Sequence, residues 1–143
     1  MKGNGQIMVG KDGGYCLSQS GTAGGNVNAA AQAATAASST ADSAAHGASK
    51  AVDGKLNTYW ASEPTTSHDP VEFVIDFGEA LPLHRGEIVW EFPAKAFTIS
   101  LSSDGTNWVD VFSTDSNSLR VTRFPLGLGA SANAKVIQRR CVA

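Results

Sequence analysis

Apolar and polar residues alternate with a period of two over much of the second half of the chain. Residues 71–77 and 97–102 each carry an apolar side chain at every second position. Such alternation is typical of strands that bury one face. Residues 86–92 add a run rich in β-branched and aromatic side chains, which favours a further strand. Two more strands, at 119–124 and 134–142, complete the predicted set.

Turn chemistry between these runs predicts how they connect. Asp104 and Gly105 separate residues 97–102 from an apolar run at 108–112, and an Asp-Gly pair in this position is typical of a β-hairpin. Residues 125–133 are rich in Gly, Ala and Ser and are expected to form a loop. Many short strands with turn signals, and no long helical pattern, predict an all-β sandwich. The pattern alone leaves the strand topology open.

The N-terminal part of the chain gives a weaker signal. Residues 1–15 are Gly-rich and polar, so we expect a flexible lead-in there, followed by one domain over residues 16–143. Residues 21–49 are dominated by Ala, Ser, Thr and Gly. A short helix at 30–37 agrees with intrinsic propensity, but Thr and Ser interrupt any apolar stripe with helical spacing.

The composition limits the classes of function. With 143 residues the chain is long enough for one ordinary core. Its net charge is −2 and its Lys and Arg residues are scattered, so no basic stripe indicates nucleic-acid binding. Its apolar runs are far shorter than the roughly 20 residues that span a bilayer. A nucleic-acid partner and a membrane-spanning helix are therefore not expected.

A turn with several oxygen groups lies within residues 51–62. Asp53 and Gly54 open it, because Gly tolerates positive φ and an Asp side chain can accept hydrogen bonds from nearby amides. Thr58 adds a hydroxyl, and Trp60 is expected to anchor the turn in the core. The oxygens of Asp53 and Thr58 can converge on a hard cation or on the N–H groups of the turn itself. The pattern does not decide between these two arrangements.

Motifs for catalysis are missing from the sequence. It contains no Gly-x-Ser-x-Gly, His-Glu-x-x-His or Cys-x-x-Cys. His68 and Asp69 are adjacent in a Pro-flanked loop, and neighbours in sequence seldom form a catalytic pair. A Gly-rich stretch at 127–132 precedes a predicted strand instead of a helix, which is the wrong context for a dinucleotide site. The chain is therefore not expected to be an enzyme.

Several blocks together resemble a known family. In order they are Asn26-Val27, residues 36–39, Asp53-Gly54 with Asn57-Thr58-x-Trp60, residues 71–78 and residues 97–108. This order is similar to discoidin domains, also called coagulation factor 5/8 type C domains, which shade into the galactose-binding-like carbohydrate-binding modules. The resemblance runs from about Cys16 to Cys141. It implies a jelly-roll β-sandwich of antiparallel strands, with an extended first strand over residues 26–39.

The resemblance also implies a disulfide. Composition alone favours two unrelated thiols, but many discoidin domains join their first and last strands by a disulfide, and Cys16 and Cys141 match these positions. Closing so long a loop would stabilise the fold by about 4–5 kcal/mol in the chain-entropy model. It implies an oxidising setting, so the resemblance predicts a secreted or cell-surface protein.

A structural Ca²⁺ is common in the carbohydrate-binding members of the family. Carried over residue by residue, its ligands would be the side chains of Asp53 and Thr58 and the backbone carbonyls of Lys50 and Lys55. Residues 136–143 lack the acidic ligand that usually completes such a site, and hard ions prefer several anionic oxygens. A turn that satisfies its own hydrogen bonds is therefore the favoured alternative.

The family binds its ligands with loops at the end of the sandwich away from the chain termini. The corresponding loops here are residues 41–49, 63–69 and 92–96, with 114–118 beside them. Sugar recognition uses polar groups that converge on hydroxyls, often with an aromatic platform. The candidates are His46, Glu63, His68, Asp69, Glu91 and Lys95, with Phe92 as the platform. Ordinary solvated loop residues are the alternative interpretation.

The other large aromatic residues are not expected to bind ligand. Trp60, Trp90 and Trp108 match positions of the family's core, so burial is predicted for each. Phe92 is then the only large apolar residue on the loops, and one side chain does not supply the two signals that stable membrane attachment needs. Binding to membrane lipid is therefore disfavoured.

These expectations combine into a non-catalytic extracellular binding or adhesion module, monomeric as an isolated domain. A rigid β-sandwich would present short loops to a glycan or glycoprotein at little conformational cost. The alternative is a protein–protein assembly module of a larger multidomain secreted protein, in which the loops contact a sister domain.

Overall fold

The computed structural model describes residues 4–11, 29–31, 33–63, 70–126 and 130–139. Along the chain the elements are β1 (Asn4–Lys11), β2 (Ala34–Ala37), α1 (Ser43–His46), the 3₁₀ helix η1 (Ala48–Ala51), β3 (Trp60–Ala61), β4 (Val71–Phe92), β5 (Ala96–Ser102), β6 (Val109–Thr114), β7 (Val121–Pro125) and β8 (Ala130–Arg139). Within these residues, no helix has the length and apolar character required to cross a bilayer.

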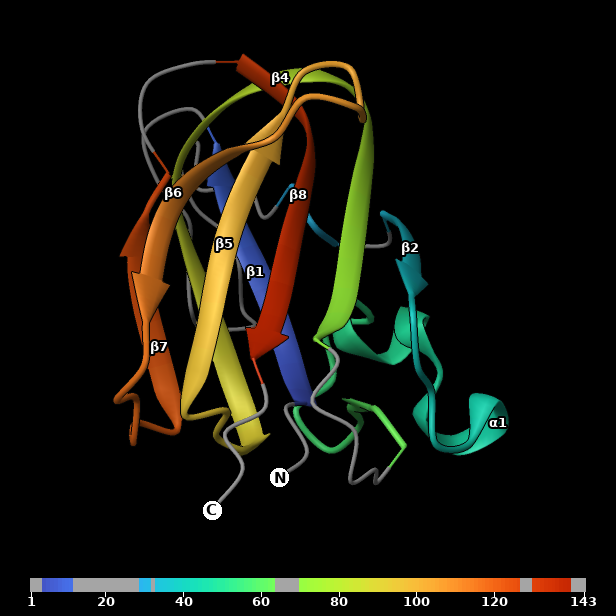
Figure 1. The fold of residues 1–143 in the computed structure, drawn as a ribbon. Coiled ribbons are helices and arrows are strands. Elements are labelled where there is room, and N and C mark those ends of the chain that lie inside the picture. The colour runs from blue at the N-terminus through green and yellow to red at the C-terminus, as the bar shows by residue number, and fades with distance from the viewer. Residues whose placement is uncertain (1–3, 12–28, 32, 64–69, 127–129, 140–143) are drawn as a thin grey trace.

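The strands form two antiparallel sheets (Figure 1). In sheet A, β1 lies between β3 and the second half of β4, which also pairs with β7. In sheet B the order is β2, the first half of β4, β8, β5 and β6. The predicted all-β, jelly-roll sandwich is confirmed.

Strand β4 passes from one sheet to the other. The two runs predicted at 71–77 and 86–92 are therefore parts of one strand. Between them, Gly78 has a φ of 81°, a conformation that residues with a Cβ rarely adopt. Its N–H donates to Asp76 Oδ1 at 2.8 Å, and the register with β8 shifts between Asp76 and Leu81. β4 therefore begins and ends at one end of the sandwich, and its bend crosses the opposite end.

The predicted flexible lead-in is wrong for Asn4–Lys11, because these residues form β1. β1 pairs with β4 between Phe92 and Leu83 and also pairs with β3. Its Ile-Met-Val run is a short set of good strand formers, but its partners lie far along the chain, so no local pattern identifies it. The predicted domain boundary at residue 16 and the pair Cys16 and Cys141 lie outside the described residues and stay predictions.

The first strand implied by the resemblance is shorter than expected. Among the described residues of this range, 29–31 and 33–39, Ala34–Ala37 form a strand, β2, which pairs with β4. A turn precedes it, in which Ala33 N donates to Ala30 O at 3.0 Å. The loop predicted at 125–133 is also shorter, since β8 begins at Ala130.

The core lies between the sheets and includes two of the three tryptophans. Trp60 and Trp90 are each 2% exposed, as predicted. Both indoles keep a hydrogen bond inside the protein: Trp60 Nε1 donates to Ser39 O at 3.1 Å, and Trp90 Nε1 donates to Thr122 Oγ1 at 3.0 Å. Each ring therefore buries a large apolar surface without leaving its N–H unsatisfied.

Trp108 corrects the prediction that all three indoles lie in the core. It is half-buried, and Lys135 Nζ lies 4.5 Å from the centre of its ring. Lys135 pairs across sheet B with Ser100 and Val74, on the face that points away from Phe73 and Ile99. Trp108 therefore covers the outer face of sheet B and contacts a cation there.

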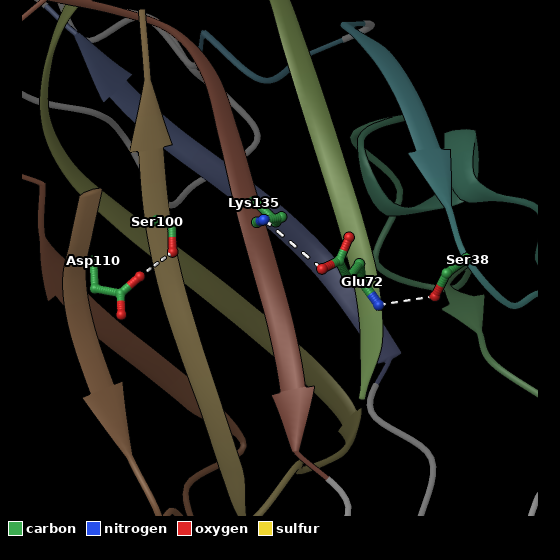
Figure 2. Close-up of polar contacts among 5 residues, drawn as sticks. All are labelled: Ser38, Glu72, Ser100, Asp110 and Lys135. Carbon is green, nitrogen blue, oxygen red and sulfur yellow. Dashed lines mark hydrogen bonds and ion pairs between the residues drawn. The ribbon is translucent and has the colours of Figure 1, made fainter. Parts of the chain in front are cut away.

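Polar contacts connect neighbouring strands on this outer face (Figure 2). Ser100 Oγ donates to Asp110 Oδ1 at 2.6 Å, joining β5 to β6. Lys135 Nζ lies 3.7 Å from Glu72 Oε1, joining β8 to β4. The backbone N–H of Glu72 donates to Ser38 Oγ at 2.9 Å, just beyond the end of β2. The polar residues of the period-two pattern thus tie the sheet together sideways.

The predicted β5–β6 hairpin is confirmed, and Asp104 holds its turn. Its carboxylate accepts the backbone N–H groups of Asn107 and Thr106, each at 2.8 Å. The side chains of Asn107 and Ser102 donate to the same carboxylate at 2.7 and 2.9 Å. The backbone N–H of Asn107, then that of Thr106 and the two side chains, hold the pKa of Asp104 well below its usual range.

Candidate ligand-binding site

The described parts of the predicted ligand loops lie at one end of the sandwich. Strand pairing places Phe92 beside Asn4, and Ala96 beside Arg139, so these residues share that end. Val71 pairs with Gln138, which brings residues 62–63 and the β2–η1 segment to the same end. The first residue of β1, Asn4, and the last residue of β8, Arg139, therefore lie beside the loops. The expectation that the loops lie away from the chain ends is wrong for the described part of the chain.

The turn from Asp53 to Thr58 forms its own hydrogen bonds. Asp53 Oδ1 accepts the N–H of Lys55 at 2.9 Å, and Oδ2 accepts the hydroxyl of Thr58 at 2.6 Å. Gly54 has a φ of 77°, which lets the chain reverse. Thr58 is followed closely by the buried Trp60. The turn is thus fixed at one side by a carboxylate and at the other by an indole, as the sequence predicted.

The same bonds bear on the possible calcium ligands. Both carboxylate oxygens of Asp53 and the carbonyl of Lys55 already accept hydrogen bonds within the turn. Among the described residues, no three His, Cys, Asp or Glu side chains gather where they could hold a metal ion. Ca²⁺ takes six to eight oxygen ligands, several of them anionic. The described residues fit a self-satisfied turn better than a calcium site, and calcium binding stays a prediction.

Helix α1 positions His46 over the turn. Asp42 caps this short helix, and its Oδ1 accepts the N–H groups of Ala44 and Ala45 at 3.0 and 3.3 Å. The His46 ring stacks on the ring of Tyr59, with centroids 4.4 Å apart and an interplanar angle of 23°. His46 Nδ1 also lies 3.3 Å from Tyr59 O. The half-buried imidazole therefore fixes both the ring and the backbone of Tyr59.

A shallow cleft of about 40 Å³ opens beside this pair. Its lining residues come from the turn, from β4 and from the start of β7: Leu56, Thr58, Tyr59, Val89, Trp90, Glu91 and Arg120. The volume holds a few waters or one small polar group, but not a whole sugar ring. A ligand would thus insert a substituent here and lie across the rim.

Strand register places the charged groups of the cleft together. Val89 pairs with Val121, and Trp90 N donates to Arg120 O at 2.7 Å, so Arg120 lies next to Glu91. Arg120 Nη2 is 3.8 Å from Glu91 Oε2, too long for a hydrogen bond. The side chain of Arg120 is 69% exposed and that of Glu91 is 42% exposed. The pair is loose, and such surface pairs contribute little to stability.

The structure brings some of the predicted residues together and leaves others apart. Glu91 lines the cleft, and His46 stacks on Tyr59, which also lines it. Glu63, Phe92 and Lys95 are exposed at the same end without lining the cleft, and Phe92 is 50% exposed. His68 and Asp69 lie outside the described residues.

Sequence reasoning missed Tyr59 and Arg120. Tyr59 lies between Thr58 and Trp60, inside the most distinctive block of the sequence, so its place on a fixed turn was a usable signal. Arg120 had no such signal, because its position next to Glu91 depends on the register of β7 against β4.

Comparison with solved structures shows close likeness to carbohydrate-binding modules. Chitosan-binding module 2 of a chitosanase/glucanase from Paenibacillus sp. IK-5, solved with chitotriose, is 32% identical with a TM-score of 0.73; the match covers 78% of this chain and 87% of that one. Module 1 of the same enzyme is 28% identical with a TM-score of 0.73, covering 79% and 86%.

A more distant likeness is to the family 32 CBM of Clostridium perfringens NanJ, solved with galactose. It is 18% identical with a TM-score of 0.64, covering 78% of this chain and 85% of that one, and at this identity the likeness concerns the fold alone. The comparison with curated protein sequences gives no match.

The fold and its solved relatives define a class of protein, the galactose-binding-like β-sandwich modules. Residues 33–131 match the family model of the F5/8 type C domain. The chain belongs to the F5/8 type C domain family, as the sequence resemblance predicted. Strand β1 lies before the matched residues and still forms part of sheet A.

Proposed function

We propose that this domain is a non-catalytic module that binds amino-sugar polymers of the chitosan type. The observation that carries the proposal is the cleft in which Tyr59, Glu91 and Arg120 meet. The solved modules that are 27–32% identical are described as chitosan-binding, and one was solved with chitotriose. A shared fold does not fix a ligand, so the proposal depends on the chemistry of the cleft.

Glu91 supplies that chemistry. Its carboxylate is only loosely paired with Arg120, at 3.8 Å, so it can accept a hydrogen bond from a sugar hydroxyl or pair with the ammonium of a glucosamine unit. Arg120 offers several N–H donors beside it, suited to neighbouring hydroxyl oxygens. The cleft admits one such substituent at a time. Glu91 is therefore the principal polar contact in this proposal.

Calorimetric titration with chitotriose tests the proposal. Glu91→Gln keeps the shape of the side chain and removes its charge, and we expect it to weaken binding about tenfold or more. Glu79→Gln is the matched control, because Glu79 is exposed near the bend of β4 at the other end of the sandwich. Its affinity should equal that of the unchanged domain. Equal affinity of both variants would contradict the role of Glu91.

A protein partner is the second candidate, and it is favoured by exposed apolar side chains. Leu56, Phe92 and Leu119 are 59%, 50% and 60% exposed near the loop end. Apolar residues of this kind occur at protein–protein interfaces as well as in sugar sites. If the domain binds no sugar in the titration but co-purifies with a neighbouring domain or glycoprotein, and Leu119→Ser abolishes that association, the assembly function is supported instead.

The setting of the module is part of the proposal. A module of this kind would act outside the cell, either in adhesion or in holding an attached enzyme on its polymer. The predicted pairing of Cys16 with Cys141 would suit an oxidising compartment. Mass mapping of the protein in its native host would show whether these thiols are joined.

A further inference from the structure

We propose that Tyr59, held in place by His46, is the aromatic platform of this site and determines which sugars it accepts. The inference rests on the proposed function, because it takes the cleft at Glu91 as the sugar site. It assigns the platform to Tyr59 in place of Phe92, which is the ring that the loop pattern nominates. The ligand class that follows is a sugar with apolar C–H groups on both ring faces.

Tyr59 has the geometry of a platform. It lines the cleft together with Glu91, so a sugar whose substituent enters the cleft would lie next to Tyr59. Phe92 does not line the cleft, although it is 50% exposed. An aromatic ring that lies beside the polar groups of the cleft can pack against the same sugar unit that they hold. This criterion selects Tyr59.

The surroundings of Tyr59 keep the ring in one orientation. The preceding residue, Thr58, donates a hydrogen bond to Asp53 Oδ2 at 2.6 Å, and the following residue, Trp60, is buried. The imidazole of His46 stacks on the ring at 4.4 Å, and its Nδ1 lies 3.3 Å from Tyr59 O. A ring fixed in this way loses little side-chain entropy when a sugar binds. His46 is therefore a positioning residue, and it acts through Tyr59.

A fixed platform discriminates between sugars by the shape of their faces. Glucosamine units carry their ring substituents equatorially, which leaves C–H groups on both faces to pack against an aromatic ring. The axial hydroxyl of galactose interrupts one of these faces, so galactose has a single apolar face to pack against the ring where glucosamine has two. The site should therefore prefer chitotriose to galactose, and the preference should depend on Tyr59.

The test measures affinity for chitotriose and for galactose in a set of variants of the full chain. Tyr59→Ala should weaken chitotriose binding about tenfold and reduce the preference over galactose, whereas Tyr59→Phe should retain both. Phe92→Ala should have little effect. Val109→Ala is the matched control for loss of an exposed apolar side chain, because Val109 is 66% exposed and begins β6 beyond the hairpin turn. Thermal unfolding of each variant shows that the domain remains folded.

His46 is tested by replacement and rescue. His46→Ala should weaken chitotriose binding, and His46→Phe, which keeps a ring for stacking but removes Nδ1, should restore most of it. Equal losses in His46→Ala and His46→Phe would overturn the positioning role of the stack.

The outcomes separate the two proposals. If Glu91→Gln loses binding while Tyr59→Ala retains both affinity and preference, the sugar site stands and the platform is not Tyr59. A strong loss in Phe92→Ala with none in Tyr59→Ala would return the role to Phe92 and overturn the inference. If the unchanged domain binds neither sugar, the proposed function fails, and the platform fails with it.

Discussion

Removing the carboxylate of Asp53 is the sharpest test of how the central turn is held. Asp53→Ala deletes two hydrogen bonds that the carboxylate accepts, one from Lys55 N at 2.9 Å and one from Thr58 Oγ1 at 2.6 Å. Each such bond contributes about 0.5–1.5 kcal/mol net. Since Asp53 and Thr58 are only half-buried, we expect a total loss of about 1–2 kcal/mol in the free energy of unfolding. For a domain of this size that lowers Tm by roughly 3–8 °C.

The assay is thermal unfolding in a buffer with a chelator and in a buffer with calcium. A turn that satisfies its own oxygens predicts the same loss in both buffers. Thr58→Ser keeps the hydroxyl and is the matched control, so its Tm should stay close to that of the unchanged domain. A calcium-dependent rise in Tm that Asp53→Ala abolishes would show that the carboxylate holds a cation, as the family resemblance implied. An unchanged Tm for Asp53→Ala in both buffers would refute the reasoning about the turn.

Three further predictions concern the sheets. Gly86→Ala should cost about 1–3 kcal/mol, because an added Cβ would collide with the buried ring of Phe124. Urea unfolding measures this cost, and equal stability of the variant would contradict the packing. Arg123→Met should cost about 1–3 kcal/mol, because Arg123 Nε lies 2.9 Å from Glu87, whose side chain is 2% exposed and would be left without this ion pair. Adding Glu87→Gln removes the buried charge and should recover part of the lost stability. The lowered pKa of Asp104 stabilises the fold above its ordinary value of 3.8, and this contribution is lost as the pH falls through the lowered pKa. Asp104→Asn should therefore lose less stability between pH 6 and pH 3 than the unchanged domain, and equal slopes would contradict the role of the carboxylate.

The sequence predicted those parts of the fold that depend on local pattern. Period-two alternation identified β5 and the first half of β4, because one face of each is buried. The Asp-Gly pair at the β5–β6 turn identified the hairpin. The Asp53 turn and its indole anchor were also predicted, since all of their groups lie within a few residues of one another.

Features that depend on contacts between distant residues were not predictable in the same way. β1 has few strand formers, and only its pairing with β3 and β4 makes it a strand. The contact of Tyr59 with His46 joins the turn to helix α1, 13 residues earlier in the chain. Trp108 was expected in the core, but the β5–β6 register shifts between Ile99 and Ser100, and a shift of this kind changes which face a side chain occupies.

In the candidate site, too, residues with a local signal were predicted and residues placed by distant contacts were not. Glu91 was predicted because the polar loop residues could be read from the sequence. Its partner Arg120 was not predicted, since nothing local in the sequence connects it with β4. The sequence therefore indicated the end of the sandwich that carries the site better than it indicated the members of the site.

The most direct measurement of the central claim is a nuclear magnetic resonance titration of the domain with chitotriose. Trp90 lines the cleft, whereas Trp108 lies over the outer face of sheet B, so the two indoles serve as a reporter and a reference. We predict that the signals of Trp90, Tyr59 and Glu91 shift together and saturate, while the indole signal of Trp108 stays in place. Shifts that gather around Trp108, or no saturable shift at all, would contradict a sugar site at this end of the sandwich.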